Sequence, residues 1–432
     1  MSSPYKKVAF YTLGCKLNFS ETSTIARDFI SAGYSKVNFM DDADIYVINT
    51  CSVTDNADSK TNRLIRKIKK KSPDSYVAIV GCYAQLKTQE ISEIPGVDMV
   101  IGAGDKFNLP QYLDKYYNSK EKIFSEFNID SVNKFIPSYS LDERTRSFIK
   151  IQDGCDYSCS FCTIPLARGR SRSGKISDIL KTINNISQSN IKEIVLSGIN
   201  VGDFGVNNGE SLLELLKSIE LTSGVQRCRI SSIEPNLLSD EIIDLIGSST
   251  KILPHFHIPL QSGSNRILKL MQRRYDLNLY KSKIEKIKKI IPNCCIGVDI
   301  IVGFPSENDE DFLSTYNFLN SLDITYLHIF SYSERENTRA ILLENKVPES
   351  IKQERRKTLA LLSDIKREDF IRCNLNNNYN ILFESYENGY VSGWTENYIK
   401  TYVKGNKELI NTIKTVKLIQ CNSDSASGEI IH

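Results

Sequence analysis

The chain is poor in histidine, in net charge and in long apolar runs. Only four histidines occur among 432 residues, so the sequence offers few ligands for zinc sites that combine cysteine and histidine. The formal net charge is only +3, which excludes the overall basic field of many nucleic-acid-binding proteins. The sequence has no run of 18 apolar residues and no charged-then-apolar leader. We therefore expect a non-secreted, cytoplasmic protein that does not enter a membrane.

The remaining composition is that of an ordinary globular protein. With 41% hydrophobic and 25% charged residues, the chain has enough apolar material for cores that need no disulfides. Its length corresponds to roughly three domains of about 150 residues each. Eleven cysteines in a reducing compartment are then expected to be thiols, metal ligands or catalysts rather than bridges.

Three cysteines follow three apolar, strand-like stretches near the start of the chain. Cys15 follows VAFYTLG, Cys51 follows DIYVINT and Cys82 follows SYVAIVG. Helical patterns come after each stretch, which predicts a Rossmann-like α/β domain with parallel strands. Because parallel strands end at one edge of the sheet, where such sheets hold ligands, we expect the three thiols to converge there. Together they could hold a soft metal centre; three independent buried cysteines are the alternative.

A second cysteine set lies on one short segment. The stretch IQDGCDYSCSFCTIPLARGRSRSG (151–174) contains Cys155, Cys159 and Cys162 in a C-x3-C-x2-C pattern after an apolar strand. One loop with this spacing can wrap a four-iron cluster and leave one iron open. The open iron can chelate S-adenosylmethionine, whose cleavage by one electron yields a deoxyadenosyl radical. Phe161 suits packing near the cluster and the adenine, and a zinc or purely structural role is the alternative.

Apolar strands and helices alternate between about residues 144 and 371. Six strand candidates with their helices predict an open (β/α)6 barrel: 148–151, 193–197, 228–233, 255–259, 296–302 and 325–331. Active sites of such folds lie at the carboxyl ends of the strands. Five residues near those ends are therefore predicted to bind cofactor, although polar and glycine residues also build tight loops: Ser197, Gly198, Glu234, Gln261 and Gly303.

The end of the chain has a different pattern. From about residue 375, β-forming residues alternate with turn residues, which predicts a small antiparallel barrel of about five strands. Residues 372–432 contain six basic and six acidic residues, so generic phosphate attraction there is weak. Trp394 and Tyr398 could stack on bases, or they could be core residues.

Basic residues gather elsewhere, in two runs near the proposed sheet edge. The stretch 60–71 has seven basic residues and no acid, and 167–175 has four. Such runs could bind the phosphates of a folded RNA, or they could be solvated surface. The predicted RNA contacts are Arg63, Arg66, Lys67, Lys70, Arg168, Arg170 and Arg172.

These motifs together resemble the radical S-adenosylmethionine methylthiotransferase family over the whole chain. Further matches are LSGINVGDFG (196–205), SSIEPN (231–236), HIPLQSGS (257–264), LKLMQRRY (268–275) and DIIVGFPSE (299–307). GCKLN and IFSYSERENTRA (329–340) are most similar to the threonylcarbamoyladenosine tRNA methylthiotransferases. One departure is Glu336-Asn337-Thr338, where Pro-Gly-Thr is expected.

The resemblance implies three domains and two clusters. The domains are an N-terminal methylthiotransferase domain (1–130), a radical S-adenosylmethionine core (141–371) and an RNA-binding TRAM-like barrel (372–432). Each cysteine set would hold one [4Fe-4S] cluster, and S-adenosylmethionine would serve as cofactor. One molecule would methylate a sulfur on the cluster of Cys15, Cys51 and Cys82, and a second would supply the radical.

The implied reaction is methylthiolation of C2 of N6-threonylcarbamoyladenosine at position 37 of tRNA, next to the anticodon. The implied partners are tRNA, a flavodoxin- or ferredoxin-like electron donor and a sulfur donor, with a monomeric enzyme. The alternatives are methylthiolation of isopentenyladenosine in tRNA, methylthiolation of a ribosomal-protein aspartate, and a non-catalytic iron–sulfur RNA-binding protein.

Overall fold

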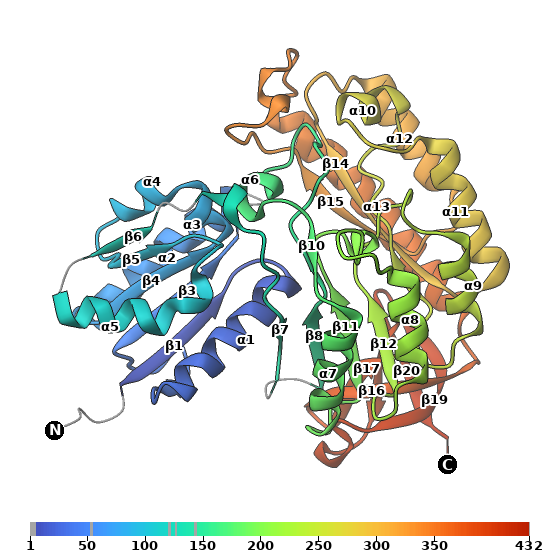
Figure 1. Cartoon of the computed structure of the whole chain (residues 1–432). Helices are drawn as coiled ribbons and strands as arrows, with labels where there is room; N and C mark the ends of the chain where they lie inside the picture. Colours follow the sequence, from blue (N-terminus) through green and yellow to red (C-terminus); the bar gives the residue numbers. More distant parts are fainter. Residues whose placement is uncertain (1–5, 52–54, 120–121, 126–127, 142–144, 432) are drawn as a thin grey trace. The chain divides into compact units, whose positions relative to one another are not determined.

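A computed structural model of the protein describes residues 6–51, 55–119, 122–125, 128–141 and 145–431 (Figure 1). The chain divides into two units. Unit 1 is Met1–Leu141, Phe148–Tyr157 and Cys162–Ser173, and unit 2 is Asp142–Ser147, Ser158–Phe161 and Gly174–His432. The boundaries of the three predicted domains stay a prediction. Within the described residues, no helix combines the length and apolarity that crossing a membrane requires.

Unit 1 is built on a six-stranded parallel sheet in the order β2-β1-β3-β4-β5-β6. Strands β3 and β4 are buried along their whole length, which explains why their sequences are continuous apolar runs. The strand order reverses between β1 and β3, the kind of position where open α/β sheets bind ligands. The strands are β1 (Lys7–Thr12), β2 (Ser35–Val37), β3 (Ile45–Thr50), β4 (Tyr76–Gly81), β5 (Met99–Ile101) and β6 (Ile123–Ser125).

Helices cover both faces of this sheet. On one face, Ile65 and Ile68 of α2 pack with alternate residues of β3 and β4. On the other face, Ile25 and Phe29 of α1 pack with the intervening residues. The predicted α/β architecture is thus confirmed. The helices are α1 (Lys16–Ser31), α2 (Asp55–Lys71), α3 (Cys82–Leu86), α4 (Thr88–Ser92), α5 (Leu109–Ser119) and α6 (Ile164–Arg168), with short strands β7 (Ser138–Tyr139), β9 (Gln152–Asp153) and β10 (Arg172–Ser173).

Unit 2 contains the alternating strands and helices of the predicted barrel. Strands β11 and β12 are parallel, as are β13, β14 and β15, and a parallel bridge between Ser232 and His257 links the two groups. Strand β8 (Arg146–Lys150) crosses the unit boundary along the chain, with Arg146 and Ser147 in unit 2 and Phe148–Lys150 in unit 1. All six predicted strands are therefore present. The other five strands are β11 (Glu193–Ser197), β12 (Arg227–Ile230), β13 (His255–His257), β14 (Cys295–Val302) and β15 (Tyr326–Ser331).

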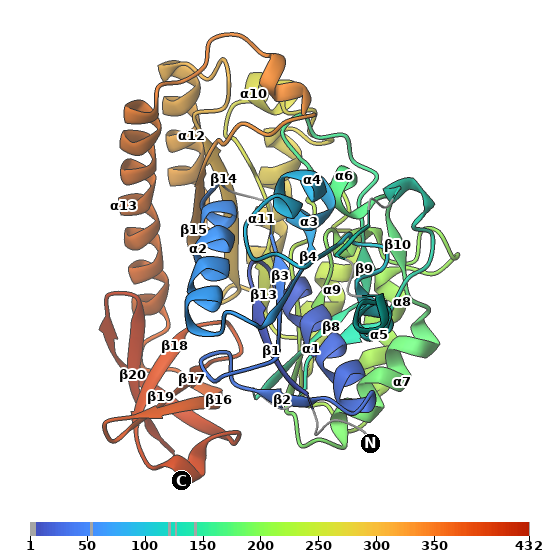
Figure 2. The same cartoon turned by 90° about the vertical axis from the view of Figure 1, so that its left-hand side faces the viewer.

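The helices of unit 2 begin at local capping signals. Ser211, Ser239, Asp276 and Asn308 each accept a hydrogen bond from the backbone N–H three residues later, which satisfies a donor that a helix start leaves open. Figure 2 shows the longest helix, α13 (Glu349–Cys373), beside β15. The others are α7 (Ile176–Ser187), α8 (Leu212–Leu221), α9 (Asp240–Ser248), α10 (Asn265–Leu270), α11 (Leu277–Ile290) and α12 (Asp309–Ser321).

The last residues of unit 2 form a closed barrel of five strands in the order β16-β17-β18-β20-β19. The closing pair β18–β20 is parallel, whereas the other pairs are antiparallel as predicted. Apolar side chains such as Phe383, Val391 and Leu418 fill its interior. The strands are β16 (Asn378–Glu387), β17 (Tyr390–Trp394), β18 (Lys400–Lys404), β19 (Ile413–Asn422) and β20 (Ser425–Ile430).

Candidate functional site

The ends of β1 and β3 are held together around Cys15 and Cys51. The Asn18 side-chain amide donates hydrogen bonds to the carbonyl oxygens of Leu13, at 2.9 Å, and Thr50, at 3.0 Å. Gly14 has a φ of +100°, and a Cβ there would lie 2.6 Å from the Cβ of Cys51. Only glycine fits this turn, because a side chain would displace Cys51.

Cys82 joins this group from the end of β4. Burial raises the pKa of the Cys82 thiol, the charges of Arg168 and Lys106 oppose that shift, and Cys15 lies near enough to raise it further. Cys15 is the N-cap residue of α1, where the helix favours negative charge. The structure thus brings the three cysteines to one edge of the sheet. Such a soft thiolate set fits a four-iron cluster with three protein ligands.

A buried ion network lies beside these cysteines within unit 1. Glu21 accepts hydrogen bonds from Lys106, at 2.6 Å, from Lys150, at 3.1 Å, and from Arg168, at 3.1 Å. Arg168 also binds Asp153, at 2.8 Å, and the Asn18 side-chain oxygen, at 2.6 Å. Arg168 therefore connects helix α1, whose N-cap residue is Cys15, to Asp153, two positions before Cys155.

The network carries more positive than negative charge. Its cations are Lys106, Lys150, Arg168 and Arg172, and its carboxylates are Glu21 and Asp153, a difference of 4 − 2 = +2. Buried cations need compensating negative charge. Thiolates at the neighbouring cysteines would supply it, which again fits an anionic cluster at this edge.

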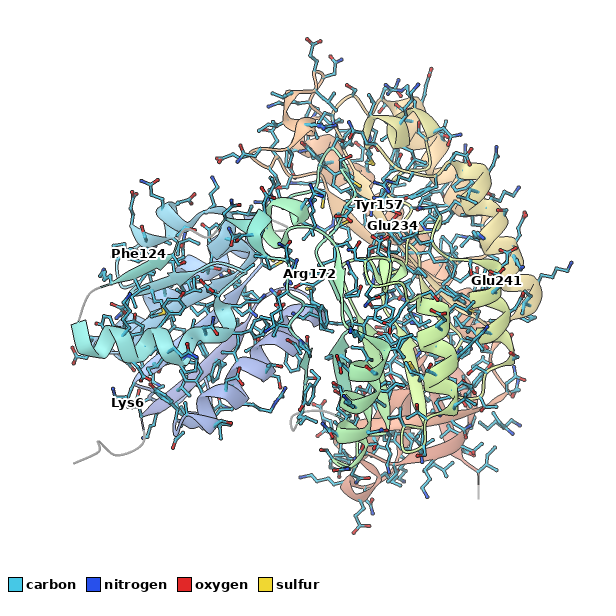
Figure 3. All side chains as sticks on the ribbon, viewed as in Figure 1. Lys6, Phe124, Tyr157, Arg172, Glu234 and Glu241 are labelled. Atoms are coloured by element: carbon cyan, nitrogen blue, oxygen red, sulfur yellow. The ribbon has the colours of Figure 1, made fainter. Side chains whose placement is uncertain are left out.

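The placement of the arginines corrects part of the RNA-contact prediction. Arg168 is 1% exposed, and Arg172 is 8% exposed with a 2.8 Å bond to Asp153 (Figure 3 labels Arg172). Both guanidinium groups are bound inside the protein, so we do not propose them as RNA contacts. Arg170, by contrast, is exposed.

In unit 1, backbone N–H groups point at two sulfurs of the second cysteine set. The N–H of Tyr157 lies 3.4 Å from the Cys155 sulfur, and that of Ile164 lies 3.5 Å from the Cys162 sulfur. Cys155 N–H in turn binds the Gly169 carbonyl at 3.0 Å. Hydrogen bonds of this kind stabilise negative sulfur and tune the potential of a cluster.

In unit 2, Cys159 is paired with an arginine that sequence reasoning missed. Arg273 donates a 3.0 Å hydrogen bond to the Cys159 sulfur and forms an ion pair with Glu234. Burial raises the pKa of both Cys159 and Glu234, and Arg273 opposes each shift. Arg273 thus links Glu234, labelled in Figure 3, to Cys159. The signal was present, because Arg273 lies inside the quoted LKLMQRRY motif.

Three other predicted cofactor residues lie in unit 2: Phe161 and Gln261 in loops, and Gly303 directly after β14. Phe161 packs edge-on against Phe304, with ring centroids 6.4 Å apart. Gln261 has a φ of +68° and donates its N–H to the Asp299 carbonyl. The N–H of Gly303 binds the Glu307 carboxylate.

Ser197 and Gly198 end strand β11. The Ser197 hydroxyl lies 3.3 Å from the Val195 carbonyl of its own strand, and Gly198 is half-buried. Cofactor binding by Ser197, Gly198, Gln261 and Gly303 stays a prediction.

The predicted basic surface on α2 is present. The side chains of Ile65 and Ile68 face the core, and the basic residues between them point outward. The exposed basic face, as we call it, comprises Lys60, Arg63, Arg66, Lys67 and Lys70. Its position on the helix that follows Cys51 is that expected for a phosphate-binding surface.

Trp394 and Tyr398 belong to a stacked group in unit 2. Their rings lie 4.4 Å apart, and Tyr398 also stacks on His255 at 4.2 Å. Arg227 and Arg229, both bound to buried Glu193, donate to backbone carbonyls of residues 394–396. These contacts tie the small barrel to the strands of unit 2, which is a structural role for both aromatic residues; their predicted RNA contact stays untested.

The departure at Glu336-Asn337-Thr338 has a physical explanation. Asn337 adopts a φ of +62°, in the left-handed region where glycine is expected. Asparagine tolerates that region better than most other residues. The turn is therefore retained without glycine.

Comparisons with known proteins agree with this arrangement. Residues 7–102 match a family described as "Uncharacterized protein family UPF0004", and residues 149–319 match the Radical SAM superfamily. A solved radical S-adenosylmethionine methyltransferase, TsrM from Kitasatospora setae, has a similar fold, with a TM-score of 0.55 over 76% of this chain and 75% of that one, at 12% identity. The fold and site thus define a radical S-adenosylmethionine enzyme.

Curated relatives define the family more narrowly. A threonylcarbamoyladenosine tRNA methylthiotransferase MtaB of Bacillus subtilis (strain 168) is 38% identical over 98% of this chain and 96% of its own length. The protein of that name in Aquifex aeolicus (strain VF5) is 40% identical over 95% of this chain and its full length. A tRNA-2-methylthio-N(6)-dimethylallyladenosine synthase of Bacillus subtilis (strain 168) is 31% identical over 99% of this chain and 86% of its own length. The chain belongs to the radical S-adenosylmethionine methylthiotransferase family.

Proposed function

We propose that this enzyme methylthiolates C2 of N6-threonylcarbamoyladenosine next to the anticodon of tRNA. The observation that carries the proposal is the pair of cysteine sets, one at the sheet edge and one on residues 155–162, in a chain whose relatives of 38–40% identity are named for this activity. The bound clusters and S-adenosylmethionine would supply radical removal of hydrogen from an inert C–H bond, together with sulfur and methyl groups.

The residues of the chain would divide this work. Cys15, Cys51 and Cys82 would hold the auxiliary [4Fe-4S] cluster, with Arg168 and Lys106 stabilising its negative charge. Cys155, Cys159 and Cys162 would hold the radical-generating cluster. Arg273 would keep its guanidinium on the Cys159 sulfur and hold Glu234 in place for a polar group of S-adenosylmethionine.

Binding of tRNA would use the exposed basic face of α2 together with Arg170. These residues lie in unit 1, the unit that contains the first cysteine set. Phosphate contacts position a nucleic acid without reading its sequence. The proposal extends to a cytoplasmic, monomeric enzyme that receives electrons from a flavodoxin- or ferredoxin-like protein and sulfur from a separate donor.

The second candidate substrate is isopentenyladenosine in tRNA. It is supported by the relatives of about one-third identity that are named as dimethylallyladenosine synthases. Both reactions share the clusters and the adenine C2, and they differ only in the group on the adenine N6.

Mass spectrometry of tRNA nucleosides tests the proposal. The protein is expressed in a host that lacks methylthiolated adenosines, beside its Cys155→Ala and Cys373→Ala variants. Cys373 is an exposed cysteine outside both sets, so its variant is the matched control.

We expect methylthio-threonylcarbamoyladenosine with the wild type and Cys373→Ala, and none with Cys155→Ala. Methylthio-isopentenyladenosine alone would move the assignment to the second candidate. Cluster-loaded protein without any new nucleoside would refute both tRNA substrates.

A further inference from the structure

Three potential metal ligands that belong to neither cysteine set gather in unit 2. They are His257 at the end of β13, Asp299 in β14 and His328 in β15. One ligand atom from each lies within 4.8 Å of the others, and within the described part of the chain this group alone meets that condition. Nothing in the proposed methylthiolation uses these three side chains.

The strand register brings the three residues together. Asp299 pairs directly with His328, and His257 pairs with Gly297, two residues before Asp299. Because alternate residues of a strand point to the same face, all three side chains project from one face of the sheet. Their backbone is anchored: the Asp299 carbonyl accepts the Gln261 N–H at 2.8 Å, and the His257 carbonyl accepts the Ile233 N–H at 3.0 Å.

The ring of Tyr326 lies beside the group and limits how it can move. A Cβ at Gly297 would lie 2.3 Å from the Tyr326 ring, so that ring fills the space beside position 297. Tyr326 is held by a 3.1 Å hydrogen bond between its hydroxyl and His255 Nε2. Its ring meets the edge of His328 at 5.1 Å. The ligand group therefore has a filled side and an open side.

The charges and the exposure suit a cation. His257 Nε2 lies 2.8 Å from Asp299 Oδ1, and these side chains are 22% and 20% exposed, so an ion has access. The nearby carboxylate of Glu234 is already paired with Arg273. The Asp299 carboxylate supplies one negative charge beside the two imidazoles, which suits a divalent cation.

We propose that His257, Asp299 and His328 bind one divalent transition-metal ion, distinct from the iron–sulfur clusters. Two imidazoles and one carboxylate are the donor set of many Fe(II) sites, and similar ligands also take Mn²⁺ and Zn²⁺. The cysteine sets, with soft thiolate donors, select different metals. Three protein ligands also leave coordination positions for water or for an oxygen of a bound substrate.

Titration of the cluster-loaded protein with Mn²⁺ tests the proposal. Mn²⁺ competes poorly for thiolates, and its EPR signal can be followed while the clusters are kept in their oxidised, EPR-silent state. We expect one Mn²⁺ per chain, with affinity lowered at least about tenfold in Asp299→Asn and in His328→Ala, as loss of a ligand requires. Asp323→Asn is the matched control, because Asp323 is an exposed carboxylate of unit 2 that pairs with Lys288 outside the group.

Absence of saturable Mn²⁺ binding, or equal affinity in the wild type and both variants, would overturn the proposal. An equal loss in Asp323→Asn would also overturn it, because a nonspecific effect of removing a carboxylate would then explain the result. If Asp299→Asn does not fold, Asp299→Glu retains the carboxylate and must retain measurable binding. The titration needs neither RNA nor turnover, so its outcome is independent of the tRNA assay.

Discussion

Replacing Glu21 with glutamine is the most direct test of the buried ion network. Glu21 is fully buried and binds Lys106, Lys150 and Arg168 at 2.6–3.1 Å. Burial alone would raise the pKa of Glu21, but these three cations hold it well below its usual value, so the group is ionised at neutral pH. Glutamine retains the size and shape of glutamate, so the substitution removes the charge and turns one acceptor oxygen into a donor without opening a cavity.

The expected loss of stability is large. Breaking a buried ion pair by removing one partner costs about 3–5 kcal/mol, because the other charge stays desolvated. With about 2–4 °C per kcal/mol, the Tm of unit 1 should fall by about 6–20 °C. Anaerobic differential scanning calorimetry of the cluster-loaded protein measures this shift. The exposed Glu93 offers the matched control Glu93→Gln, for which we expect a change within about 0.5 kcal/mol.

The pH dependence of stability in the wild type and in Glu21→Gln tests the direction of the Glu21 pKa shift. A carboxyl whose folded-state pKa is depressed stabilises the fold above the unfolded pKa, about 4.3, and loses that contribution as pH falls towards the folded pKa. The stability difference between the wild type and Glu21→Gln should therefore be constant from pH 8 to about 5.5 and shrink below about 4.3. Equal stability of Glu21→Gln and Glu93→Gln, or a difference that already vanishes between pH 8 and 6, would refute the reasoning.

Three further predictions concern the cysteine sets and the RNA surface. Gly14→Ala should push Cys51 away and lower the iron content from about eight to about four per chain. Gly33→Ala is the control, because its added methyl meets no neighbouring atom. Full iron content in Gly14→Ala would contradict this. Arg273→Gln should shift the reduction potential of the radical cluster by removing a charged donor from Cys159, and an unchanged potential in spectroelectrochemical titration would contradict the contact. Replacing Arg66 and Lys67 of the exposed basic face with glutamine should weaken tRNA binding for all sequences alike. The slope of log affinity against log salt concentration should fall in magnitude by about one unit per lost phosphate contact, which filter binding at several salt concentrations measures. An unchanged slope would exclude this face.

Much of the fold could be predicted because its signals are local. The continuous apolar runs before Cys15, Cys51 and Cys82 predict buried parallel strands. Because the cysteines come directly after these runs, their thiols are expected at one edge of the sheet. The strand order β2-β1-β3-β4-β5-β6 was not predicted, because it depends on how the whole sheet assembles. The structure confirmed this architecture, together with the six strands of the core and the five-stranded barrel.

Charged residues were harder to interpret because their role depends on partners that are distant along the chain. Arg168, Arg170 and Arg172 stand in one basic run, and the run alone makes all three candidates for RNA contact. In the structure, Arg168 reaches Glu21, which lies 147 positions away in sequence, and Arg170 remains exposed. A pattern of charges cannot distinguish a buried ion pair from a solvated one, since burial is a property of the packed chain.

The sequence by itself determined the two cysteine sets and the parallel sheet, because these follow from spacing and periodicity over short stretches. The family was indicated by the resemblance of motifs along the whole chain. Tertiary structure alone decided which side chains surround the sulfurs. It placed Arg273 on Cys159 across 114 positions and assembled His257, Asp299 and His328 from three strands. Such groups form only when strands pair in a definite register, and register is set by the packing of the whole core rather than by any local pattern.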